Sequence, residues 1–152
     1  MLNIDRVWSR VSQLPQYRGK KLSDFILQDV TYSSQLTTGQ ALANQPVIFP
    51  AGAILVGGRA GAAIPGVAAT QTGRDGLDMF TVAIADQQTQ RNIVGTTQML
   101  ASAVFGRFND QFPAKEIIVP VNGGLLYSFT NLTTTTINIY FTHDCLVPAA
   151  QG

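Results

Sequence analysis

The stretch from Lys115 to Pro148 constrains the fold of this chain more than any other part, because its apolar residues alternate over a long run. Near its end, one series of alternate positions consists of Ile137, Ile139, Phe141, His143 and Cys145. The positions between them are Thr136, Asn138, Tyr140, Thr142 and Asp144. A period of two predicts a β-strand with one buried face. Such a strand needs a second apolar layer to lie on, so the sequence predicts an antiparallel sandwich.

Two shorter alternating runs precede this strand and are joined by Asn122-Gly123. The first run carries Ile117, Val119 and Val121, and the second carries Leu125, Tyr127 and Phe129. Because an Asn-Gly pair tolerates the positive φ of a two-residue turn, the two runs are predicted to form a hairpin. About eight such strands, separated by Gly, Pro, Asn and Asp turns, are expected along the chain, which is the strand number of a jelly roll.

Four further segments between residues 22 and 105 are expected to belong to the sandwich, beside a strand with Phe80, Val82 and Ile84 on one face. The first, residues 22–32, is predicted to be a strand, and the candidates for its inner face are Phe25, Leu27 and Val30. Residues 45–49 and 53–56 are expected to pair across the Pro50-Ala51-Gly52 turn. Residues 93–105 fit either a helix or a strand, and we favour a strand because strands are predicted on both sides.

Charged residues are scarce, and those that are basic gather at the start of the chain. Only 12% of the 152 residues are charged, against roughly 25% in an average soluble domain. Residues 1–21 have a net charge of +4 and the remaining residues a net charge of −3. With 45% apolar residues and no run near the ~18 that a membrane helix requires, much of the surface is expected to lie against other protein chains. No secretory signal is apparent, and the single cysteine excludes an internal disulfide framework.

The first 21 residues are predicted to form a helical arm with a basic linker, followed by the sandwich at 22–148 and a short tail at 149–152. Asn3 can cap a helix that Pro15 ends, and its apolar face consists of Ile4, Val7, Trp8, Val11 and Leu14. This face either packs on its own domain or inserts into a neighbouring subunit, and the second alternative makes its five residues a protein interface. In that case Arg6 and Arg10 face solvent, nucleic acid or an acidic partner. A helix on a membrane surface is the weaker third alternative, since only two cations lie on the polar face.

No residues in the sequence form a pattern typical of a catalytic, metal or cofactor site. His143 and Cys145 lie on one face of a strand, but a zinc site needs three or four ligands and the chain has no second histidine. We interpret the pair as a buried thiol beside a hydrogen-bonded histidine. Asp75 and Asp78 offer two of the ~6 to 8 ligands that calcium takes. Asn131-Leu132-Thr133 matches a glycosylation acceptor but is interpreted as a polar turn.

One loop carries aromatic residues beside polar ones. It contains Phe108, Asn109, Asp110 and Phe112. These aromatic side chains either close one end of the sandwich or contact a partner. The second alternative would suit a carbohydrate-binding or adhesin-type module, our alternative hypothesis for the function. An enzyme of cupin-like build would require a histidine cluster that the chain lacks.

The ending VPVNGGLLYSFTNLTTTTINIYFTHDCLVP, with Phe80 to Asp86 and the Pro50-Ala51-Gly52 turn, resembles jelly-roll structural proteins of tailed-phage particles, namely decoration, cement and minor head or collar proteins. The resemblance covers residues 22–148 as an order of features. It implies a non-enzymatic virion protein, assembled in the host cytoplasm, that self-associates and attaches to other capsid or head proteins. It implies no catalytic residue, cofactor or small-molecule substrate, and neither nucleic acid nor a membrane is an expected partner.

Overall fold

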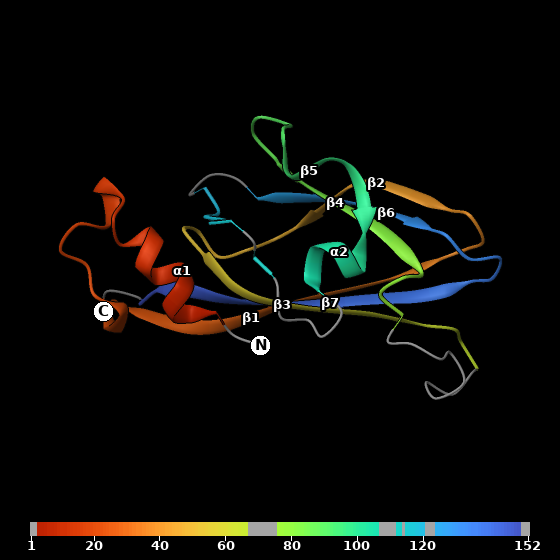
Figure 1. Ribbon diagram of the computed structural model, residues 1–152, viewed down its shortest axis with the longest axis horizontal. Coiled ribbons are helices and arrows are strands. Elements are labelled where there is room, and N and C mark those ends of the chain that lie inside the picture. The colour runs from red at the N-terminus through yellow and green to blue at the C-terminus, as the bar shows by residue number, and fades with distance from the viewer. Residues whose placement is uncertain (1–2, 67–75, 107–111, 114, 121–123, 150–152) are drawn as a thin grey trace.

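The computed structural model describes residues 3–66, 76–106, 112–113, 115–120 and 124–149, with side chains for all of these except 95–97. Figure 1 shows two layers of strands with a helix over one end. The helical elements are α1 (Ile4–Val11), η1 (Pro15–Tyr17), η2 (Leu22–Asp24) and α2 (Ala101–Phe105). The strands are β1 (Phe25–Leu36), β2 (Ala41–Val47), β3 (Ile54–Ala63), β4 (Phe80–Asp86), β5 (Asn92–Leu100), β6 (Leu125–Asn131) and β7 (Ile137–Pro148).

All the strand pairs are antiparallel, and they form one sheet of order β1-β7-β3 and a second of order β2-β6-β4-β5. An eighth short segment extends the first sheet beside β3. There the N–H of Leu55 donates to the carbonyl of Ile117 at 3.0 Å, and the N–H of Val119 donates to the carbonyl of Ala53 at 2.8 Å. The order β1-β7-β3-(117–119) over β2-β6-β4-β5 is the jelly-roll arrangement, which confirms the predicted all-β sandwich with an N-terminal helix.

Two predicted hairpins are wrong in their pairing. Residues 117–119 bond to β3 in the first sheet, whereas β6 lies in the second sheet between β2 and β4. The turn expected at 122–123 lies outside the described residues. Similarly, β2 pairs with β6 and β3 pairs with β7, so the Pro50-Ala51-Gly52 connection crosses between sheets. Alternation determines which face of a strand is buried but not which strand it pairs with, and both arrangements bury the same faces.

The core lies between the two sheets and is rich in stacked aromatic rings. As predicted, alternate residues of β7 from Ile137 to Cys145 are buried. The rings of Tyr127 and Phe141 stack with centroids 4.7 Å apart. In β1, however, Leu27 was expected inside and instead pairs with Leu146 on the outer face, 48% exposed. Phe25 is also buried outside the main core, beneath α1.

The segment 93–105 combines both structures that its sequence allowed. Residues up to Leu100 continue β5, and Ala101–Phe105 form α2. Gly106, with a φ of 82°, follows α2 in a conformation that favours glycine. The teal helix α2 lies between the two layers in Figure 1 and contacts β3, β4 and β5. It therefore closes one side of the sandwich.

Asn131 organises the turn between β6 and β7. Its side-chain nitrogen donates to the carbonyls of Leu36, Thr37 and Thr135 at 3.2, 2.9 and 2.8 Å. Its side-chain oxygen accepts from the backbone and hydroxyl of Thr133. The residue is only 2% exposed, so its amide has a structural role in this turn and in joining it to the β1–β2 turn.

Candidate functional site

The surface that distinguishes this sandwich is the outer side of the three-stranded sheet, of which α1 covers one end. There, residues of the helix, of the segment that follows it and of the sheet form a second apolar cluster. It consists of Val7, Val11, Tyr17, Phe25, Ile54, Val56 and Leu146, with Ile4, Trp8, Leu14, Leu22 and Ile118 packed against it. The Trp8 ring lies 5.2 Å from that of Phe25 and 6.4 Å from that of Tyr17. All five residues expected at an interface between subunits therefore pack on their own domain, the first of the alternatives that the sequence left open.

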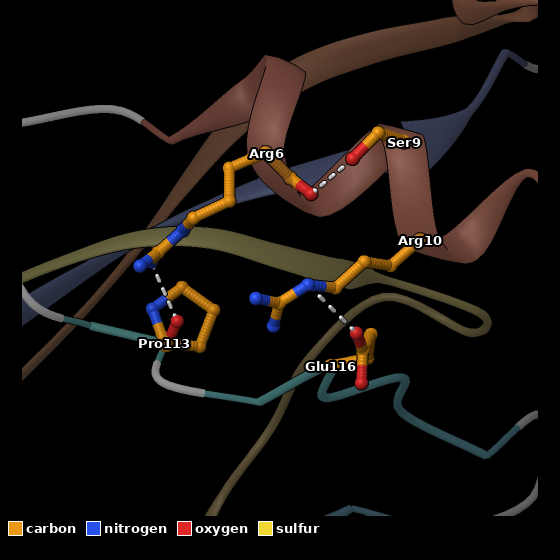
Figure 2. A network of polar contacts seen from close by, with 5 residues as sticks. All are labelled: Arg6, Ser9, Arg10, Pro113 and Glu116. Atoms are coloured by element: carbon orange, nitrogen blue, oxygen red, sulfur yellow. Dashed lines mark hydrogen bonds and ion pairs between the residues drawn. The ribbon is translucent and has the colours of Figure 1, made fainter.

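Polar contacts fix α1 to the segment around residue 113, as Figure 2 shows. Arg6 donates to the carbonyl of Pro113 at 2.7 Å, and Arg10 lies 3.5 Å from Glu116. On the helix itself, Ser9 donates to the carbonyl of Arg6 at 2.8 Å. The two arginines, which were expected to face solvent, nucleic acid or an acidic partner, are exposed to solvent and also contact residues of their own chain. They join the N-terminal helix to a segment more than 100 residues away.

Because Trp8 packs on its own sheet, Trp8→Ala is expected to lower the free energy of unfolding by about 2 kcal/mol, below the usual cost for a buried tryptophan since this one is half-buried. Chemical denaturation measures the loss. Gln13→Ala, at an exposed position just beyond the helix, is the control and is expected to stay within about 0.5 kcal/mol of the wild type. A Trp8→Ala protein of unchanged stability but smaller assembled mass would instead give Trp8 a role between subunits.

The loop expected to contact a partner is only partly described. Phe108, Asn109 and Asp110 lie outside the described residues. Phe112 is 2% exposed and packs in the core, with its ring 5.2 Å from that of Phe105 and 4.6 Å from that of His143. It therefore closes the sandwich, which is the first of the two roles considered for it.

His143 and Cys145 form the buried pair that the sequence indicated. Tyr127 Oη lies 2.5 Å from His143 Nε2. Burial lowers the pKa of His143 to about 3, although the nearby Gly57 backbone opposes this shift, so the ring is neutral at pH 7. Burial, with Asp144 and Asp29 adding to it, raises the pKa of Cys145 to about 12. A neutral histidine and a protonated thiol make no activated nucleophile.

A small cluster of charged residues lies on the outer face, beyond α1. Asp144 is 6% exposed and is opposite Asp29 in the β1–β7 ladder. Burial and then the neighbouring Asp29 raise the pKa of Asp144 to about 6, while Arg59, at 3.7 Å, opposes the shift. The described residues hold no group of three or more His, Cys, Asp or Glu side chains that could bind a metal ion. We interpret the cluster as a structural contact between β1, β7 and β3.

An apolar cavity of about 210 Å³ lies beside α2. Its lining includes Met99, Val104, Phe112, Lys115 and Ile117. This volume is below the roughly 300 to 1,000 Å³ of typical small-molecule sites. The cavity is large enough for one apolar side chain, and Lys115 is the one cation among the described residues that line it.

Large apolar side chains are exposed along β1 and just after β2. Ile26 and Leu27 are 53% and 48% exposed, and Ile48 is 88% exposed. The sequence analysis missed these residues because it treated apolar side chains in strands as core. One signal was available, since the twelve residues of β1 contain no Lys, Arg or Pro, the residue types that usually protect a strand edge.

Comparison with protein-family models and with curated proteins gives no match to this chain. None of the helices that the structure describes is long and apolar enough to cross a membrane.

Proposed function

We propose that this chain is a non-enzymatic structural subunit of a phage particle, which self-associates and attaches to other capsid or head proteins. The observation that carries the proposal is the exposure of Ile26, Leu27 and Ile48 on a sandwich whose chain has so few charges. Exposed apolar side chains of this kind favour burial against other protein. The assignment to a phage particle rests on the resemblance of residues 22–148 to jelly-roll proteins of virions.

The test of self-association is the mass of the full chain by light scattering on a sizing column. We expect a closed oligomer, with Ile48→Lys reducing its mass or its affinity. Leu132→Lys is the matched control, because Leu132 is also exposed, at 52%, but lies in the turn after β6. A chain that stays monomeric at high concentration would contradict self-association.

The test of the virion role is mass spectrometry of gradient-purified particles from the source. Peptides of this chain are expected in amounts comparable to other head proteins. Their absence from intact particles would contradict the capsid role while leaving self-association intact. The two parts of the proposal can therefore fail separately.

A carbohydrate-binding module is the second candidate, and one observation favours it. Tyr140 is 52% exposed on the outer face and lies so close over Gly61 that a Cβ there would overlap its ring and hydroxyl. An exposed ring held flat on a sheet resembles the stacking platforms on which sugars bind. A glycan array that gives binding lost in Tyr140→Ala would favour this candidate over the structural subunit.

A further inference from the structure

The free side of β1 is an unpaired strand edge, and we refer to it as the β1 edge. β1 is the first strand of its sheet and pairs along its whole length with β7 alone. In an antiparallel strand every second residue directs both its N–H and its C=O to the same side, so about half of the twelve residues point away from β7. Among the described residues no backbone hydrogen bond from another segment reaches these groups. Such an edge can accept a further strand.

The other three sheet edges that the structure describes carry features that discourage strand addition. β2 contains Pro46, and its register with β6 shifts between Leu42 and Gln45. The register of β5 against β4 is also broken twice. The edge at 117–119 is short and is followed by Pro120. Proline, irregular register and short length are the usual means of protecting an edge.

The β1 edge has none of these features. Its twelve residues pair with β7 from Phe25 to Leu36 without a register shift. Its only charged residue is Asp29, which pairs with Asp144 on the outer face. A long, regular and nearly uncharged edge with exposed apolar side chains at one end is suited to addition of another strand.

We propose that the β1 edge joins a second copy of this chain, with the two β1 strands antiparallel about a two-fold axis at Thr31. This inference rests on the proposed self-association and names its surface. About a two-fold axis perpendicular to the sheet, the numbers of two opposite residues add to twice the number of the residue on the axis. With Thr31 on the axis, Asp29 is therefore opposite Ser33 of the second copy. Val30 is then opposite Tyr32, a β-branched and aromatic pair of the kind that stabilises sheets.

Charge favours a second copy as the occupant. With the axis at Thr31, no like charges are opposite one another, and a serine hydroxyl faces each Asp29 carboxyl group. All residues of β1 from Ile26 to Leu36 find a partner within β1 of the other copy, and Phe25 alone does not. Two three-stranded sheets thereby become one continuous sheet.

The register is tested by Thr31→Cys in the full chain under mild oxidation. At a two-fold axis the two Cα atoms of opposite residues lie about 4.5 to 5.5 Å apart, within the range of a disulfide. We expect a dimer that reducing agent dissociates on a denaturing gel. Thr38→Cys, exposed in the turn after β1, is the matched control and is expected to remain monomeric on the gel. Cys145 is fully buried and does not interfere.

The edge itself is tested by the double variant Thr31→Lys, Gln35→Lys, which places cations at two exposed positions of β1, opposite Thr31 and Leu27 of the second copy. We expect at least a tenfold weaker association by light scattering, with the far-ultraviolet circular dichroism unchanged, whereas Thr38→Lys associates normally. Oligomers that survive the double variant, or that give no Thr31→Cys cross-link, would overturn this inference and leave the proposed self-association standing. A wild-type chain that is monomeric throughout would overturn both.

Discussion

Phe112→Ala is expected to lower the free energy of unfolding by about 4 kcal/mol, within the range measured for removing a buried aromatic ring. The ring is 2% exposed and packs between those of Phe105 and His143. It also lies against β3, where a Cβ added at Gly58 would be 2.7 Å from Phe112 Cδ1. Neighbouring atoms held this closely by the two sheets cannot collapse fully into the vacated space, so a cavity remains.

The same substitution has a second consequence, because Phe112 also lines the apolar cavity beside α2. Without the ring, that cavity is expected to extend to His143 and to admit water. Hydration would raise the pKa of His143 from about 3 toward its ordinary value. Chemical denaturation measures the stability, and proton NMR of the imidazole measures the pKa in Phe112→Ala.

Phe112→Leu is the matched control for this prediction. It keeps most of the apolar volume and is expected to cost about 1 to 2 kcal/mol, with the histidine still neutral at low pH. A loss below about 0.5 kcal/mol in Phe112→Ala, the range of surface substitutions, would contradict a core position and restore the partner-contact role that the sequence allowed.

The second large effect is expected in the dependence of stability on pH, where His143 and Asp144 act in opposite directions. The pKa of His143 is about 3 in the folded chain, below the ordinary 6.5, so the unfolded chain binds more protons and stability falls as the pH drops from 6.5 to 3. Each pH unit in this range costs up to about 1.4 kcal/mol.

Asp144 has a folded pKa of about 6, above the ordinary 3.8, so the folded chain binds more protons between these values. This carboxyl group therefore adds stability as the pH falls from 6 to 4. Over that interval the two contributions oppose each other in the wild type. Below pH 4 only the histidine contribution continues, and it destabilises the fold.

Asp144→Asn separates the two groups. We expect the free energy of unfolding of the variant, minus that of the wild type, to fall as the pH is lowered from 7 to 4. The reason is that asparagine cannot take up the proton that stabilises the wild type over this interval. Carboxyl groups that do not contact Asp144 are common to both proteins and cancel in the difference, whereas Asp29, opposite Asp144, loses a neighbouring carboxyl group and is measured together with it. Urea denaturation at half-unit steps from pH 7 to pH 3.5 measures the difference, and a difference independent of pH would contradict the raised pKa of Asp144.

Alternation in the sequence was enough to predict the faces of the strands but not their partners. The buried series from Ile137 to Cys145 was correct because a period of two fixes which side chains share a face. The pairing of 117–119 with β3 could not be predicted, since it is set by contacts between segments far apart in sequence. The Asn122-Gly123 pair indicated a local connection, and tertiary pairing overrode it.

The candidate site was harder to predict for a related reason. An amphipathic helix has the same sequence pattern whether it packs on its own chain or on another. The sequence therefore could not show that Val7 and Val11 are buried against their own chain, and the structure was needed to show it. Conversely, Ile26 and Leu27 are indistinguishable from core residues by hydropathy. Only the lack of Lys, Arg and Pro in β1 indicated an open edge. This lack becomes informative when β1 is compared with the other edges of the two sheets, which the structure identifies.

The central place of β7 in its sheet has a consequence for how the chain is made. In the part of the chain that the structure describes, β1 pairs with β7 alone, and the docking site of α1 includes Leu146 of β7. Both elements are synthesised before β7, and part of their apolar surface stays uncovered until β7 has left the ribosome. Completion of this sheet is therefore expected to wait for β7, and a chain cut short before β7 leaves β1 without its strand partner and leaves α1 with only part of its docking site, in β3.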